Sequence, residues 1–492
     1  MAVPAAGVVA TGTTRGAGSG APVGQGADAA APSPGAGPEP PLTRVPARPR
    51  GVLALAWPSL VENLLLMMLN TGSLMMVGRL GAGAMASVGA AGQISNVIII
   101  VFSGIAAGTT ALVARAVGAG DGAEARAIAR QSLGVGAAIA ATCGLLGFTF
   151  APSLVGILGV APEVVAAAVP LVRVACALLP VLVTGVLAGA ALRGAGDTRT
   201  PMWNTGMANV VNLAVAFVAI YGLGPVPGMG VHGVAVGWIA GQGIAGLLGL
   251  RALARQRHGP LAGALDPLGH LAGWRLDLPV LRRIVAVGGP AAGEYASIQV
   301  GMIVFSIMVV RMGTAAFASQ QAIFTAANVS MMPGLAFSVA ATTLVGQHLG
   351  AGDPAAARAA GWRSTLAAVA WMSVAGLLFI LFPAPLLGIF TTDPDVVAAG
   401  SIGIRMIGFG QPLQAAAFVL SGALRGAGDT RTTLVIGSLS MWFVRLGLAW
   451  TLGIAAGWGV AGIWLAWCID WCVRGTAYLI AFHRGDWQRV RV

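Results

Sequence analysis

Two glutamates lie inside long apolar stretches of this sequence, where a charged side chain is energetically costly. Glu62 and Glu294 each follow a proline by four residues, Pro58 and Pro290, and the glutamates are 232 positions apart (294 − 62). A proline kinks a helix and gives it a place to bend, and burial disfavours the charged form of a carboxyl group. We therefore interpret Glu62 and Glu294 as a repeated pair of sites that load and release a coupling proton within a membrane.

A purely structural role for the glutamates is the alternative. Arg173 and Arg405 also lie within apolar stretches and are also 232 positions apart (405 − 173), so each could form an ion pair with one glutamate. Glu62 lies about 15 Å from the inner end of its stretch, at 1.5 Å per residue. The two arginines lie nearer the outer face, so their depth matches the glutamates poorly. Their role as buried charges is left open.

Two other charges occur in apolar stretches near the end of the chain. Asp470 and Arg474 are four residues apart, one helical turn, so they are expected to neutralise each other. Arg445 has no partner nearby in the sequence. Neither Arg445 nor Asp470 receives a functional role from the sequence.

Uncharged polar side chains are the second kind of candidate. Individually, such residues more often hold helices together than contact a ligand, but as two sets they could line a wet cavity. The candidate cavity-lining residues are Asn63, Asn70, Ser73, Gln93, Asn96, Asn209, Asn212, Tyr295, Gln299, Gln320, Gln321, Asn328, Gln411 and Gln414.

The offset of 232 applies to much more of the chain than the charged residues. The decapeptide Ala191–Thr200 returns residue for residue at Ala423–Thr432. Its glycines favour the end of one helix, and Asp197 is well placed to cap the next. The chain is therefore predicted to be a duplicated unit, with two halves that face each other and a working site between them.

Composition and hydropathy indicate the elements that position these residues. The chain has 492 residues, 57% hydrophobic and 9% charged, with mean hydropathy +0.84, whereas soluble domains carry about 25% charged residues. Apolar runs of about 20 or more residues recur along it. We predict an all-α polytopic membrane protein with twelve transmembrane helices in two pseudo-twofold-related six-helix bundles.

The predicted organisation has five parts. These are a disordered cytoplasmic tail at 1–50, a first bundle at 52–255, a cytoplasmic linker at 256–283, a second bundle at 284–482 and a tail at 483–492. The spans are placed at 52–78, 84–113, 123–150, 163–191, 199–222 and 230–250, then at 284–310, 315–346, 356–382, 395–423, 432–453 and 459–482.

The basic residues indicate how the chain crosses the membrane. All 28 are arginine, and most fall in segments that share one side when both termini lie inside. The positive-inside rule then predicts a multi-pass protein of the plasma membrane with both termini in the cytoplasm. The net charge of +12 is explained by this topology, so we expect the lipid bilayer and a small-molecule substrate as partners, no nucleic acid, and a monomer.

Motifs for other classes of chemistry are missing from the sequence. No cysteine or histidine grouping has the spacing of a metal site, no nucleophile–base grouping indicates an enzyme, and no G-x-x-x-x-G-K-[ST] phosphate loop occurs. We therefore expect neither enzymatic activity nor a metal or other cofactor. Any active transport must use an ion gradient, of H⁺ or Na⁺.

The repeated turn also carries a family resemblance. The run A-L-R-G-A-G-D-T-R-T-P from Ala191 closely resembles the turn after the fourth span in the multidrug and toxic compound extrusion (MATE) family, of the prokaryotic, DinF-like type. The match continues through Val77–Gly81, Met332–Gly334 and Gly350–Asp353 and covers most of residues 52–482. The resemblance implies twelve helices in two lobes and cation-coupled export of organic, often cationic, compounds.

This sequence departs from the family pattern at the coupling residues. Many relatives have an aspartate in the first helix where Ser73 stands here, and another in the fifth helix where Ala216 stands. The seventh-helix glutamate of other relatives lies later than Glu294. Coupling is therefore expected either to have moved to Glu62 and Glu294, or to be altered in its ion, or to be weak.

The function expected from these observations is secondary antiport. An apolar cavity studded with polar groups would open alternately to the two sides and export organic, cationic xenobiotics. The alternative is a flippase for lipid-linked precursors of the same superfamily, which would need Arg173, Arg405 or Arg445 in the cavity to bind an anionic headgroup.

Overall fold

The computed structural model of the chain describes residues 51–157, 159, 161–223, 227–255, 259–262, 277–389 and 393–490. The tail predicted at 1–50, most of the linker predicted at 256–283 and the last two residues of the predicted C-terminal tail lie outside these described residues.

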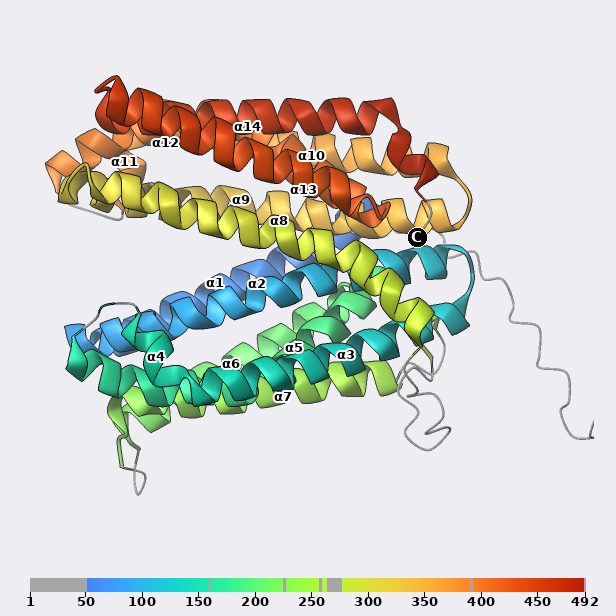
Figure 1. Cartoon of the computed structure of the whole chain (residues 1–492), viewed down its shortest axis with the longest axis horizontal. Coiled ribbons are helices and arrows are strands. Elements are labelled where there is room, and N and C mark those ends of the chain that lie inside the picture. Colours follow the sequence, from blue (N-terminus) through green and yellow to red (C-terminus); the bar gives the residue numbers. More distant parts are fainter. Residues whose placement is uncertain are drawn as a thin grey trace, which may run out of the picture. The chain divides into compact units, whose positions relative to one another are not determined.

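The described residues form helices that follow the same order in each half of the chain (Figure 1). The first half comprises α1 (Val52–Gly78), α2 (Ala82–Gly118), α3 (Gly122–Thr149), the short α4 (Ala151–Gly156), α5 (Pro162–Gly194), α6 (Arg199–Tyr221), η1 (Gly230–His232) and α7 (Gly233–Arg255). The second half comprises α8 (Leu278–Val310), α9 (Thr314–Gly350), α10 (Pro354–Leu381), the short α11 (Pro383–Gly388), α12 (Pro394–Gly426), α13 (Thr430–Leu439), the π-helical η3 (Ser440–Leu446) and η4 (Ala449–Ala455), α14 (Gly459–Arg484) and η5 (Asp486–Arg489).

Within the described residues, eleven helical segments are long and apolar enough to cross a membrane, and the apolar part of α2 at Phe102–Gly118 is a shorter twelfth. One of the eleven is the continuous segment Thr430–Ala455, which joins α13 to η3 and η4. The predicted all-α fold with six spans in each half is therefore confirmed. Some helices are longer than the predicted spans, because helices continue through polar residues beyond the apolar stretch: α8 begins at Leu278, where Asp277 accepts a hydrogen bond from the backbone N–H of Val280.

Equivalent helices pack in the same way in both halves. Helix α2 packs on α5 as α9 packs on α12, and α1 packs on α6 as α8 packs on α13. The Thr110 hydroxyl donates to the backbone carbonyl of Ala190 at 3.0 Å. Its counterpart 232 positions later, Thr342, donates to the carbonyl of Gly422 at 2.9 Å. The duplication read from the sequence is thus a duplication of tertiary contacts.

The repeated turn forms as the sequence predicts. Gly196 and Gly428 adopt φ values of 86° and 85°, which a glycine tolerates without strain. The carboxylate of Asp197 accepts a hydrogen bond from the backbone N–H of Thr200 at 3.1 Å, and that of Asp429 accepts one from Thr432 at 3.2 Å. We call the end of the bundle that carries these two turns the turn end, and the opposite end the far end.

The two halves meet through the turn-end parts of α1, α2, α8 and α9. Gly104 and Gly108 of α2 pack against Ala292 and Gly288 of α8. Leu55 and Ala56 of α1 are buried in a cluster with residues of α9 and α10. Glycine and alanine at these positions let the helix backbones approach closely.

The closest of these contacts are reciprocal. A Cβ added to Gly118 would lie 1.9 Å from the carbonyl oxygen of Gln347, and one added to Gly350 would lie 2.0 Å from that of Arg115. Gln347 is the counterpart of Arg115, and Gly350 is the counterpart of Gly118, both at the offset of 232 (347 − 115 and 350 − 118). A twofold axis between the halves produces this exchange of partners.

Most of the buried residues of helix α1 lie near the turn end, and Val77 is the one buried residue near its far end. Leu55, at the turn end, has 1% of its surface exposed, whereas Met68 and Met75 have 66% and 69%. The far half of α1 therefore lacks the cover that α9 and α10 give to its beginning.

Candidate functional site

Each of the two repeated glutamates forms an ion pair with an arginine of the repeated turn. The guanidinium Nη1 of Arg193, at the end of α5, lies 3.1 Å from Oε1 of Glu62 in α1. Nη1 of Arg425, at the end of α12, lies 3.2 Å from Oε2 of Glu294 in α8. The pairs are counterparts at the offset of 232, so the site occurs once in each half.

These partners differ from those of the structural alternative drawn from the sequence. Arg173 packs over the ring of Phe148 at 5.5 Å, and Arg405 forms no hydrogen bond or ion pair with a described residue; both are exposed. The pairing with Arg193 and Arg425 was missed because the repeated turn was placed at the membrane surface. Arg193 and Arg425 share the offset of the glutamates, and this was the available signal.

The two ion pairs have different surroundings. In the first half the side chains of Arg193 and Glu62 are 18% and 14% exposed, and Thr205 of α6 lies 3.4 Å from Glu62 Oε1. In the second half the side chains of Arg425 and Glu294 are 12% and 5% exposed. The Glu62 pair is therefore the more accessible of the two.

Additional partners surround the second pair. Arg425 donates a hydrogen bond to the Ser421 hydroxyl at 3.1 Å and packs over the ring of Tyr295 at 5.5 Å. Gly437 packs directly against the side chain of Glu294 and is the counterpart of Thr205 (437 − 205 = 232). These contacts fix the second pair more firmly than the first.

A third cluster of charges occurs in the second half. Asp470 of α14 lies 3.1 Å from Arg474, as the spacing predicted, and 2.5 Å from Nη2 of Arg445. It also accepts a hydrogen bond from Ser440. The guanidinium of Arg445 lies 3.8 Å from the centre of the Trp467 ring. Arg445, which had no partner in the sequence analysis, is thus paired and enclosed.

This cluster has no counterpart in the first half. Leu213 and Trp238 stand at the positions equivalent to Arg445 and Asp470 (445 − 213 and 470 − 238, both 232). Arg445 belongs to the π-helical segment η3, and π-turns inside helices often occur at functional sites. The side chains of Arg445, Asp470 and Arg474 are 2%, 0% and 5% exposed. Two arginines and one aspartate therefore leave one net positive charge enclosed in the cluster.

The polar candidates separate into a buried and an accessible group. Asn209 donates to the carbonyl of Leu65 at 2.7 Å, and Gln411 and Gln414 are hydrogen bonded to each other at 3.3 Å. Gln320 bonds to Ser306 at 3.2 Å. These four residues and Asn212 are buried, each within its own half: Asn209 and Asn212 in the first, the three glutamines in the second.

The accessible group lies on the helices through which the halves meet. Its members are exposed or half-buried residues of α1, α2, α8 and α9, namely Asn63, Asn70, Ser73, Gln93, Asn96, Tyr295, Gln299, Gln321 and Asn328. In the described part of the chain, no group of three or more His, Cys, Asp or Glu side chains is arranged to hold a metal ion.

Known proteins resemble this chain in sequence and in fold. The family model MatE matches residues 58–218 and 290–451. The chain is 29% identical to the probable multidrug resistance protein NorM of Thermotoga maritima over 457 residues, which cover 91% of this chain and 95% of the relative. It is 31% identical over 458 residues to the probable multidrug resistance protein NorM of Pseudomonas aeruginosa, with 90% of each covered.

A solved structure agrees with these relatives. It is described as the outward-facing conformation of a multidrug resistance MATE family transporter of the MOP superfamily, and it matches with a TM-score of 0.80 at 21% identity, over 89% of this chain and 96% of that chain. The family match covers most of both halves and begins in each at the proline that precedes the repeated glutamate, Pro58 and Pro290. This chain therefore belongs to the MatE family of multi-pass membrane transporters and is not an enzyme.

Proposed function

We propose that this protein is a multidrug efflux antiporter that exports organic, often cationic, compounds in exchange for protons or sodium ions. The observation that carries the proposal is the arrangement of the two halves, which pack closely at the turn end and expose polar side chains on the facing helices toward the far end. With the turn end in the cytoplasm, as the arginine distribution predicts, this is an outward-facing state of a transporter that acts as a monomer in the plasma membrane.

The Glu62–Arg193 pair supplies a link between ion binding and the contact between the halves. The backbone carbonyls of Arg193 and Gly194 accept hydrogen bonds from Thr343 and Gln347 of α9, each at 3.0 Å. Protonation of Glu62 would remove the counter-charge of Arg193, and the last turn of α5 would then hold α9 less firmly. Proton binding would thereby favour the state in which the turn end opens.

The placement of the arginines supports export over lipid flipping. A flippase for an anionic headgroup needs cationic groups that the headgroup can reach. Arg445 is 2% exposed and paired with Asp470, while Arg173 and Arg405 lie on α5 and α12, and not on α1, α2, α8 or α9, which carry the accessible polar candidates. Apart from the half-buried Glu62, the candidate groups on α1, α2, α8 and α9 are uncharged amides and hydroxyls, which suit organic compounds of varied shape.

Transport by purified protein in liposomes tests this proposal. Liposomes preloaded with ethidium should release it faster when the outside is made acidic or rich in sodium ions, and the faster of the two responses identifies the coupling ion. Absence of release under both gradients, together with movement of an isoprenoid diphosphate across the bilayer, would assign the protein to the flippases.

A further inference from the structure

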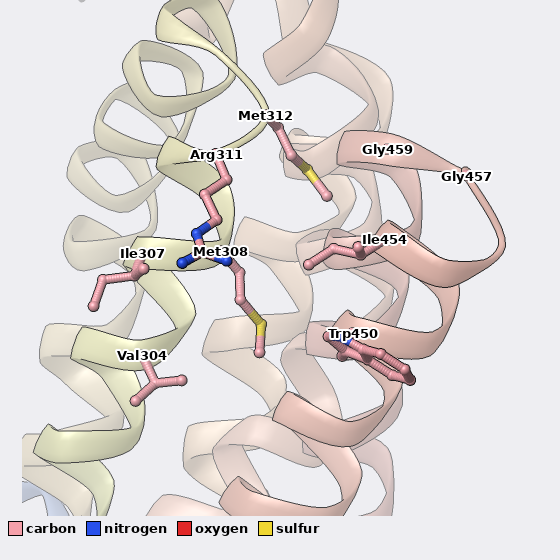
Figure 2. Close-up of a pocket in the computed structure, with 10 residues that line it drawn as sticks. Val304, Ile307, Met308, Arg311, Met312, Trp450, Ile454, Gly457 and Gly459 are labelled. Carbon is pink, nitrogen blue, oxygen red and sulfur yellow. The ribbon is translucent and has the colours of Figure 1, made fainter.

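A pocket of 490 Å³ lies at the far end of the second half, between α8 and η4 (Figure 2). We call it the Arg311 pocket. Most of its wall is apolar, formed by side chains such as Val304, Met308, Met312, Trp450 and Ile454. Its volume falls within the range of about 300–1,000 Å³ that is typical of ligand sites.

The Arg311 pocket lies on the side of α8 that faces away from the first half. Gly288 of α8 packs against α2, and Met308, which lines the pocket, is twenty residues further on (308 − 288). Twenty residues make about five and a half turns at 3.6 residues per turn, so the two positions point in nearly opposite directions. Ile307 and Trp450 on the pocket wall are 51% and 54% exposed, as expected for a surface in contact with lipid.

One charged side chain belongs to this apolar wall. Arg311 follows the last residue of α8, and Figure 2 shows its guanidinium beside Met308. Arg311 forms no hydrogen bond or ion pair with a described residue of the chain. A cation at the end of a membrane-spanning helix, beside an apolar pocket, matches a ligand with a hydrocarbon chain and an anionic headgroup.

The surface of α1 that is equivalent to this pocket wall has a different neighbour in the first half. Met76 is the counterpart of Met308 (308 − 76 = 232), and its carbonyl accepts a hydrogen bond from the hydroxyl of Tyr221 at 2.7 Å. Tyr221, the last residue of α6, therefore covers this surface of α1. In the second half the span that packs on α8 ends instead in Ala455, and the turn after it contains Gly457, with a φ of 73°.

We propose that the Arg311 pocket binds a phospholipid with an anionic headgroup, whose acyl chain fills the space between α8 and η4 while its phosphate bonds to Arg311. The site is distinct from the surfaces where the two halves meet. Its occupant would be a structural lipid held by the second half only.

Lipid retention by the purified full chain tests the proposal. Native mass spectrometry would compare phosphatidylglycerol with phosphatidylcholine of the same acyl chains, for the wild type and the Arg311→Gln variant. We expect the wild type to retain one phosphatidylglycerol about five-fold more strongly than phosphatidylcholine. This ratio corresponds to about 1 kcal/mol for one arginine near an anionic headgroup. Arg311→Gln should abolish this preference.

Three controls make the result specific. Arg79→Gln changes the counterpart arginine at the end of α1 and should leave the preference intact, while Arg311→Lys should keep most of it and shows that a charge change, not misfolding, causes the loss. Met308→Trp should reduce retention of both lipids by filling the pocket. Equal retention of the two lipids by the wild type would overturn the proposal, as would a loss of preference in Arg79→Gln equal to that in Arg311→Gln. If inorganic phosphate alone raised the unfolding temperature as much as phosphatidylglycerol does, the site would be assigned to a free anion.

Discussion

Thr343 of α9 donates a hydrogen bond across the two halves to the backbone carbonyl of Arg193, at 3.0 Å. The same arginine holds Glu62 through its guanidinium. One residue of the repeated turn thus contacts both the candidate ion-binding carboxylate and the helix that closes the turn end. In the proposed mechanism, this relationship would make the contact between the halves sensitive to the charge on Glu62.

Thr343→Val should weaken the closed turn end while keeping the shape of the side chain. Loss of one hydrogen bond costs about 1 kcal/mol, which corresponds to about a five-fold change in the ratio of the two states. Spin labels at Met68 and Val329, which are 66% and 52% exposed, would report the change as a shorter distance between the far halves of α1 and α9.

Thr342→Val is the matched control. Its hydroxyl bonds only to carbonyls of its own half, those of Ser338 and Gly422 at 2.9 Å each, so the distance distribution should stay as in the wild type. An unchanged distribution in Thr343→Val, or an equal change in both variants, would count against the link.

Gly350→Ala should prevent the closest approach of α9 and α2. The added Cβ would lie 2.0 Å from the carbonyl oxygen of Arg115, so the backbones would have to separate. We expect the same spin-label pair to show loss of the outward-facing population, with slower ethidium transport. Gly89→Ala in α2 meets nothing within 4 Å and should be neutral or slightly stabilising; equal behaviour of the two variants would contradict the close contact.

Much of the fold could be predicted from the sequence. The constant offset and the apolar stretches indicate twelve spans in two equivalent bundles, because hydropathy and duplication act over whole helices. The π-helical segments η3 and η4 could not be predicted, since an extra residue in a helical turn leaves the composition unchanged. Arg445 and Asp470 lie on different helices and 25 residues apart (470 − 445), so local spacing does not reveal their ion pair.

The candidate site was predicted less completely than the fold. Its glutamates could be identified, because a carboxylate in an apolar stretch is unusual. Their partners could not, because Glu62 and Arg193 are 131 residues apart and meet only in the folded bundle, where the Arg193 side chain reaches from the end of α5 to Glu62 of α1. The separation of the polar candidates into buried and accessible groups also depends on helix packing, which one sequence does not specify.

Asp470→Asn should destabilise the second half strongly. The change removes the one negative charge in the cluster and leaves Arg445 and Arg474 enclosed with like charge, which is expected to cost roughly 3–5 kcal/mol. Thermal unfolding in detergent measures the loss. Glu124→Gln is the control, because the side chains of its pair with Arg283 are 30% and 37% exposed and such pairs contribute at most about 1 kcal/mol. A similar small effect for both variants would show that Asp470 does not balance the cluster.

Cysteine labelling should place the turn end in the cytoplasm. Thr198 and Thr430 lie in the repeated turns but are 1% exposed, so they would resist any reagent. Arg199 and Arg431 are exposed in the same turns and serve as better positions. In a background without the four native cysteines, cysteines at 199 and 431 should react with an impermeant maleimide only after the cells are permeabilised, whereas Leu80→Cys at the far end should react in intact cells. The reverse pattern would invert the topology.

Glu62→Gln should lower gradient-driven export sharply while the protein stays folded. The amide keeps the size of the side chain but cannot titrate, and the partly exposed Glu62–Arg193 pair leaves Arg193 within reach of water, so the loss of stability should be small. The pH dependence of transport should flatten for the same reason. Ethidium release from liposomes over a range of pH, beside thermal unfolding, measures both effects.

Glu294→Gln is the matched comparison. Glu294 is 5% exposed at its side chain and Arg425 is fixed by Ser421 and Tyr295, so removal of this charge leaves a more deeply buried cation and should lower stability more than Glu62→Gln does. If the halves share the coupling, its transport should also fall; if the accessible site alone carries it, the residual transport per folded molecule should keep its pH dependence. Full transport with normal pH dependence in the double variant Glu62→Gln, Glu294→Gln would exclude both glutamates from coupling, because neither repeated site would then carry a carboxylate.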